Sequence, residues 1–97
     1  MIKISILNKA GSFAENKDIA RDIRLKDLVP ALENNENIIL DFTGVDAANQ
    51  SFIHALISDL LRKYGISILD HIEFRSCNAK TRKIIEIVTE YMQEGME

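Results

Sequence analysis

A short apolar run followed by a long amphipathic segment decides the fold of this chain. The run is Asn37-Ile38-Ile39-Leu40-Asp41-Phe42, and polar residues bound it on both sides. A short, continuously apolar segment of this kind predicts a buried central strand. After a loop at residues 43–49, large apolar side chains recur at i and i+4 over Gln50–Tyr64, and Gly65 then predicts the end of a helix. A buried strand that leads into a helix is the unit from which parallel sheets are built.

Toward the N-terminus, the chain begins with a second predicted strand. Over Ile2–Leu7, isoleucines alternate with Lys3 and Ser5, which is the period-two pattern of a strand. Residues 8–12 have the composition of a turn, and residues 13–14 are expected to begin a short return segment.

Residues 16–35 look helical, but their apolar side chains form two stripes on nearly opposite faces. One straight helix would not direct both stripes to the same core. We therefore predict two helices, near Lys17–Ile23 and Leu28–Asn34. If Asp27 is the N-cap of the second helix, Pro30 lies in the first turn, where its missing N–H group costs nothing.

Toward the C-terminus, a third strand is predicted within Ile66–Cys77, most clearly around Ile72 and Phe74. Asn78 is expected to cap a last helix that ends near Gln93. The predicted buried face of this helix comprises Ile84, Ile85, Ile87, Val88, Tyr91 and Met92. The polar half of the 50–64 helix carries Ser51, His54, Ser58 and Arg62, and this pattern predicts an exposed stripe.

Strands that alternate with helices over 97 residues predict a single α/β domain spanning residues 1–97. Its sheet should be mostly parallel, with about three or four strands packed against three or four helices. The composition, with 46% hydrophobic and 28% charged residues, is typical of a folded globular domain.

Composition and charge also narrow the function. The formal net charge is −3 and the two signs are interleaved, which disfavours a general nucleic-acid binder. No apolar run approaches the ~20 residues of a membrane span, and the first residues lack the apolar region of a signal peptide. A single cysteine allows no intramolecular disulfide. We therefore expect a cytoplasmic protein that is not attached to a membrane.

Binding sites in parallel sheets gather where strands end and the next helices begin, which here indicates Asp46–Ser51 and Ser76–Lys80. Backbone N–H groups and the helix dipole favour negative charge at a helix N-terminus, so a phosphate on Ser51 would be tolerated there. The alternative is that Asn49 or Ser51 only caps the helix, which is the commoner role of these residue types.

The strand that ends in Asp41-Phe42-Thr43-Gly44-Val45, the Asp46–Ser51 loop and the helix that follows resemble the core of a STAS domain. STAS domains include bacterial anti-sigma factor antagonists. In that family the loop leads into Asp-Ser-(Ser/Thr)-Gly, whose second hydroxyl is the phosphorylation site used in partner switching. Residues 49–52 take these four positions, so the resemblance implies Ser51 as the phosphoacceptor, whereas Asn49 and Phe52 depart from the pattern.

A closer resemblance is to the STAS-like bacterial domains of unknown function. It covers most of the chain, from residues 13–17 through Gln50-Ser51-Phe52-Ile53-His54-Ala55-Leu56 to the final helix. This resemblance implies a STAS-like fold and no particular biochemical activity.

Cys77 follows the third strand and precedes a helix start, an environment that can lower the pKa of a thiol. The alternative, which we favour, is that Cys77 is a small buried residue of the core. The sequence brings neither histidine, His54 or His71, to Cys77 as a general base, and the three residues match no metal-ligand spacing. We therefore expect no catalytic residue, metal or cofactor.

Lys80, Arg82 and Lys83 lie near the start of the last helix, where positive charge opposes the helix dipole. Such a cluster indicates either a surface for an acidic partner or solvated charge beside Glu86.

These observations favour a non-enzymatic regulatory module of intracellular bacterial signalling that binds other proteins. By family analogy, its partner would be a regulatory protein such as a kinase-like ATPase. The predicted contact surface comprises Asp46, Asn49, Gln50, Ser51, His54 and Ser58. Small-ligand or nucleotide binding stays open although no glycine-rich phosphate loop is present, and an enzyme acting through Cys77 or Ser51 is the less favoured alternative. Homo-oligomerisation is compatible with each of them.

Overall fold

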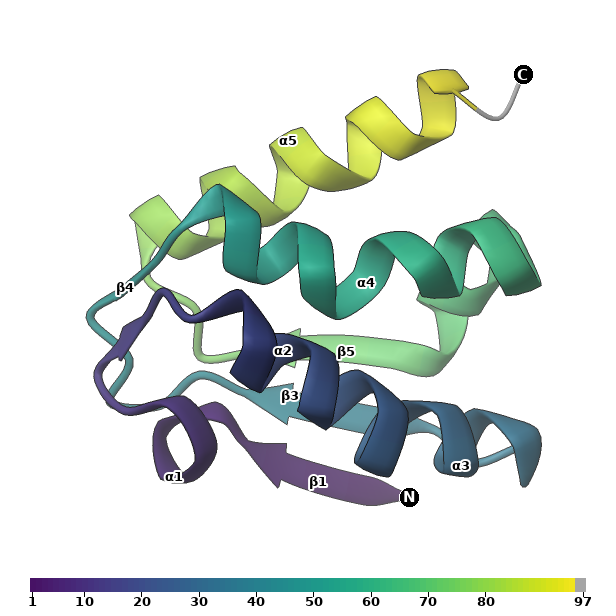
Figure 1. Ribbon diagram of the computed structural model, residues 1–97, viewed down its shortest axis with the longest axis horizontal. Helices are drawn as coiled ribbons and strands as arrows, with labels where there is room; N and C mark the ends of the chain where they lie inside the picture. The colour runs from purple at the N-terminus through teal and green to yellow at the C-terminus, as the bar shows by residue number, and fades with distance from the viewer. Residues whose placement is uncertain (96–97) are drawn as a thin grey trace.

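Three parallel strands form the main sheet of the computed structural model, which describes residues 1–95 (Figure 1). The strands are β1 (Ile2–Ser5), β3 (Ile38–Asp41) and β5 (Ile72–Arg75), and β3 lies in the middle. The sequence prediction of a parallel α/β sheet with residues 37–42 as its central strand is confirmed.

The two faces of this sheet differ in polarity. Rows such as Ile4–Leu40–Phe74 contribute to the hydrophobic core. The opposite face carries two ion pairs, Lys3 with Asp41 at 3.4 Å and Arg75 with Glu73 at 2.6 Å. The sheet therefore packs against helices on one face and presents charged side chains on the other.

Helix α4 (Gln50–Tyr64) lies between α2 (Lys17–Ile23) and α5 (Ala79–Gly95) (Figure 1). Its bounds match the sequence prediction, and Gly65 ends it with a φ of +85°. Because a helix packs on each flank of α4, these neighbours bury its apolar half and part of its polar half as well. Ser58 is only 2% exposed, so the predicted exposed stripe on α4 is wrong at this residue.

The N-terminal strand is shorter than predicted. It ends at Ser5, and Ile6–Ala10 form a short helix, α1, so Leu7 and much of the predicted turn are helical. The Ser5 hydroxyl oxygen accepts a hydrogen bond from the Asn8 N–H group at 3.2 Å and caps this helix. Ile6 is fully buried, so tertiary packing overrides the strand-like alternation here.

The two helical stripes between residues 16 and 35 belong to one continuous helical segment. A π-helical turn at Arg24–Leu28 joins α2 to α3 (Val29–Glu33). The wider turn shifts the phase of the apolar stripe, which is how both parts reach the core. The condition that Asp27 is an N-cap is therefore not met, and its carboxylate pairs with Lys9 at 3.1 Å.

A second, two-stranded sheet was not predicted. β2 (Phe13–Ala14) pairs in parallel with β4 (Ala47–Ala48), within the loop that follows β3. The predicted return segment at residues 13–14 is thus a strand whose partner is the loop before α4.

The C-terminal part begins with a 3-10 helix at Ile66–His71, which precedes β5. The buried stripe of α5 comprises Thr81, Ile85, Val88 and Met92. The prediction that Ile87 and Tyr91 are buried is wrong, because they are 42% and 66% exposed. Within residues 1–95, α5 packs mainly on α4, and a single neighbouring helix covers only a narrow stripe. None of the helices described here is both long and apolar enough to span a membrane.

Candidate functional site

The loop before α4 is held in place from two directions. On one side, Asp46 N–H donates to the Ser12 carbonyl oxygen at 2.8 Å, and Asn49 N–H donates to that of Ala14 at 3.1 Å. On the other side, the Asn78 side-chain amide donates to the Asp46 carbonyl oxygen at 2.6 Å. The two stretches that the sequence indicated, 46–51 and 76–80, therefore meet at one end of the molecule.

The first turn of α4 is capped by Asn49. Its side-chain oxygen accepts a hydrogen bond from Phe52 N–H at 2.8 Å, and its amide donates to the Glu15 carbonyl oxygen at 3.3 Å. The predicted capping role thus belongs to Asn49. Ser51 is the second residue of α4 and is exposed, and its hydroxyl forms no hydrogen bond to any residue within 1–95.

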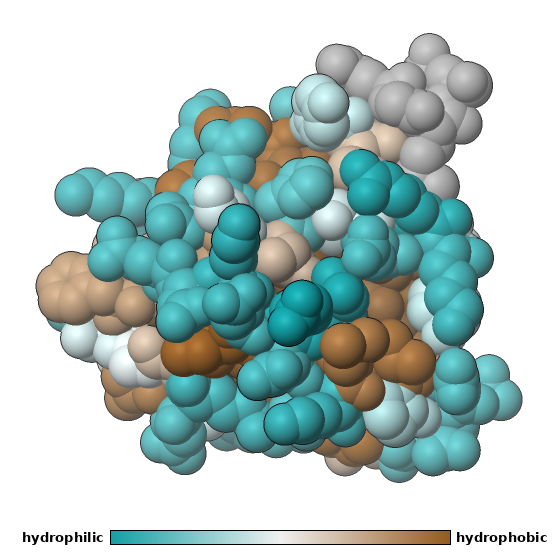
Figure 2. Space-filling model, viewed as in Figure 1, coloured by the Kyte–Doolittle hydropathy of each residue, from teal (hydrophilic) through white to brown (hydrophobic). Residues whose placement is uncertain are grey.

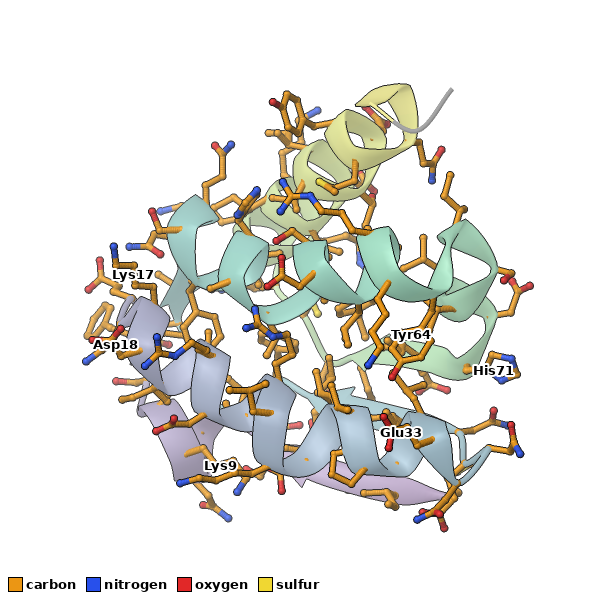
Figure 3. All side chains as sticks on the ribbon, turned by 45° about the vertical axis from the view of Figure 1, so that its right-hand side comes forward. Lys9, Lys17, Asp18, Glu33, Tyr64 and His71 are labelled. Atoms are coloured by element: carbon orange, nitrogen blue, oxygen red, sulfur yellow. The ribbon has the colours of Figure 1, made fainter. Side chains whose placement is uncertain are left out.

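Beside this turn lies a shallow hollow of about 420 Å³, lined by Lys17, Gln50, Ser51, His54 and Ala55. Figure 3 shows Lys17 at the end of α2 that lies beside the start of α4. The hollow brings together an ammonium group, a hydroxyl, an amide and an imidazole from two helices.

Next to this loop, β2 carries an exposed aromatic side chain. Phe13 is 60% exposed, and its backbone is fixed by the pairing of β2 with β4. We define the α4-start surface as Phe13, Lys17, Gln50, Ser51 and His54. Its members share an exposed or half-buried position around the pinned loop.

The predicted contact residues are only partly retained. Asp46, Gln50 and Ser51 are exposed, whereas Asn49 is half-buried and committed to capping. Ser58 is excluded from any contact surface because it is buried, with its hydroxyl oxygen 3.4 Å from His54 Nδ1.

Cys77 lies half-buried beside the core. Burial raises the pKa of its thiol and nearby Asp41 raises it further, whereas Arg82 acts in the opposite direction. Desolvation thus outweighs the effect of Arg82, which favours the interpretation of Cys77 as a small residue beside the core over that of a low-pKa nucleophile.

The histidines are far from forming a site with Cys77. His71 Nδ1 lies 2.9 Å from the side-chain oxygen of Asn37, which precedes β3. Cys77 follows β5, so it lies at the opposite end of this parallel sheet. His54 is on α4 and interacts with Ser58.

The family model for a STAS-like domain of unknown function (DUF4325) matches residues 20–82. This chain belongs to that family. The matched residues begin in α2 and end in the first turn of α5, so they include β3, β5, the pinned loop and α4. None of the curated proteins and none of the solved structures matches the chain.

Within this STAS-like domain, the position at which phosphorylated STAS motifs have glycine is occupied by Phe52. Its side chain is fully buried in the core. The departure from the motif therefore has a structural consequence, since Phe52 anchors the first turn of α4 while Ser51 beside it faces solvent.

The sequence analysis missed two residues of the α4-start surface. Phe13 stands among small and polar residues, and an isolated aromatic of this kind was the available signal. Lys17 follows the helix cap Asn16, whose side-chain oxygen accepts from Asp18 N–H at 2.8 Å. Nothing in the sequence placed Phe13 beside the loop or Lys17 beside Ser51, because the β2–β4 pairing and the packing of α2 on α4 are tertiary contacts.

Proposed function

We propose that this STAS-like domain is a cytoplasmic, non-enzymatic regulatory module that binds another protein through the α4-start surface. One observation carries the proposal: the backbone of the 46–49 loop is pinned on both sides, while the neighbouring side chains of Phe13 and Ser51 are exposed and uncommitted. The raised pKa of Cys77 supports a non-enzymatic role, because it disfavours thiolate chemistry.

A rigid surface of this kind suits protein recognition. Binding costs less entropy when the loop is already ordered. Phe13 supplies an exposed aromatic anchor, the class of residue that dominates contact energies. Lys17, Gln50 and His54 supply polar groups around it.

Ser51 is the proposed control point. A phosphate on its hydroxyl would add nearly two negative charges at the N-terminus of a 15-residue helix, where the helix dipole favours them. Lys17 lines the same hollow and would attract the phosphate. Such a change in charge would alter which partner binds, and the STAS resemblance suggests a kinase-like ATPase as one partner.

Affinity capture tests the binding surface. Wild-type protein, Phe13→Ser and Leu25→Ser are immobilised and exposed to an extract of the source cells. Leu25 is the matched control, because it is 53% exposed but lies on the π-helical turn. We expect at least one protein to be retained by wild type and Leu25→Ser and lost by Phe13→Ser. If the three proteins retain the same set, the α4-start surface is not the binding surface.

A separate experiment tests the control point. The protein is incubated with the extract and ATP, and phosphate is mapped by intact-mass and peptide mass spectrometry. We expect one phosphate that is lost in Ser51→Ala and kept in Ser67→Ala, since Ser67 is also exposed. A protein that gains no phosphate, or gains it elsewhere, removes the proposed switch and leaves a binding module without it.

A further inference from the structure

The outer side of α5 carries an apolar stripe that no other described residue of the domain covers. Ile87 and Tyr91 are exposed, and Ile84 is half-buried. These three residues follow one another at spacings of three and four, which places them on one side of the helix as in a coiled-coil seam. Hydrophobic surface is visible along the upper margin of Figure 2, where Figure 1 places α5.

Charge is distributed unevenly along the same helix. Lys80, Arg82 and Lys83 lie in its N-terminal half, and Glu86 and Glu90 lie further along. All five side chains are exposed, and among the residues of the described chain none of them forms an ion pair. The cations in the first turn thus oppose the helix dipole, so they gain little within the monomer.

We propose that a second copy of this chain covers the stripe, with the two α5 helices antiparallel about a twofold axis near Ile87. In that arrangement, a residue a given number of positions before Ile87 on one copy faces the residue the same number of positions after Ile87 on the other copy. Lys83 of each copy then lies beside Glu90 and the Tyr91 ring of the other. The two seams meet, and Ile87 contacts its own counterpart at the centre.

The charges select this orientation over the alternative. In a parallel pair, Lys83 and Glu90 of the two copies would lie on opposite sides of the seam and form no Lys83–Glu90 contact, and the two helix dipoles would repel each other. The antiparallel pair instead forms the same Lys83–Glu90 contact twice and also opposes the two helix dipoles favourably. An acidic peptide from another protein would match Lys80 and Lys83 but would meet repulsion from Glu90.

This inference is independent of the proposed function. The family match ends at Arg82, so the stripe lies beyond it. The α4-start surface shares no residue with the stripe.

Sedimentation velocity over about 10 µM to about 1 mM protein tests the inference, because one helix per copy makes a small interface and hence a weak dimer. We expect a concentration-dependent dimer. Lys83→Glu and Glu90→Lys should each raise the dissociation constant about tenfold, since each turns two attractive contacts repulsive. An equimolar mixture of these two variants should form a heterodimer, because every such contact between them is then attractive.

Ile87→Asp should abolish the dimer, whereas the matched control Leu25→Asp should not change it. A protein that stays monomeric over the whole range overturns the inference. So does a dimer that Ile87→Asp and both charge reversals leave unchanged, because it would form through another face.

Discussion

Replacement of Phe52 by alanine should destabilise this domain more than most single substitutions. Its side chain is 0% exposed and lies in the first turn of α4, within the main core cluster. Truncation of a buried phenylalanine to alanine typically costs about 3–5 kcal/mol, because transfer energy is lost and a cavity remains. Since a small domain is stable by only about 5–15 kcal/mol, much of the folded margin depends on this one residue.

The measurement is urea unfolding followed by far-UV circular dichroism, since the chain has no tryptophan to report by fluorescence. The midpoint should fall while the slope stays near that of wild type. The melting temperature should fall by more than roughly 10 °C, given about 4–8 °C per kcal/mol for a domain of this size. Phe13→Ala is the matched control, because Phe13 is exposed, and it should change stability by no more than about 0.5 kcal/mol.

The same reasoning applies to Phe52→Gly, which restores the residue type of the phosphorylated STAS motif. Glycine should cost up to about 1 kcal/mol more than alanine, because it is a poor helix former. If Phe52→Ala costs less than about 1 kcal/mol, or no more than Phe13→Ala, then core burial of Phe52 does not anchor the turn that presents Ser51.

Three further predictions concern single contacts. Asn49→Ala should lower the free energy of unfolding in urea by about 1 kcal/mol, because the Phe52 N–H group loses its acceptor. Asn49→Asp keeps a capping oxygen, so an equal loss in both variants would contradict this. Alkylation of Cys77 requires the thiolate, and burial raises the pKa of the thiol in the folded protein. The alkylation rate should therefore rise at a higher pH in the native protein than in the urea-unfolded chain, and the reverse order would refute the burial argument. The hydroxyl and N–H groups of Thr43 hold the pKa of Asp41 below its ordinary value. Thr43→Val should therefore raise that pKa, as measured by NMR titration. The stability difference from wild type should be present at neutral pH and disappear as the pH falls through the folded-state pKa of Asp41.

Elements with a strong local pattern were predicted well. The bounds of α4 follow from its apolar period and from Gly65, and the Asn78 cap of α5 is present, with its side-chain oxygen accepting from Thr81 N–H at 2.8 Å. The sheet order around β3 also followed, because an apolar strand with helices on either side in sequence is central in a parallel sheet.

The candidate site was predicted only in part. Its place at the start of α4 and the exposure of Gln50 and Ser51 were expected and are present. Phe13 and Lys17 could not be assigned to it, because Phe13 is placed by a two-residue strand pairing and Lys17 by the packing of α2 on α4, and neither contact has a local sequence pattern.

The amino-acid sequence by itself determined the fold class, the long helices and the capping of α4, since periodicity, helix caps and glycine stops act between residues close in the chain. Tertiary structure alone decided which polar side chains are buried and which apolar side chains are exposed to solvent. Ser58 is buried because α4 has helices on both flanks, and Ile87 and Tyr91 are exposed because α5 packs mainly on one. The number of neighbours around a helix depends on how distant segments pack, and no local pattern of residues specifies it.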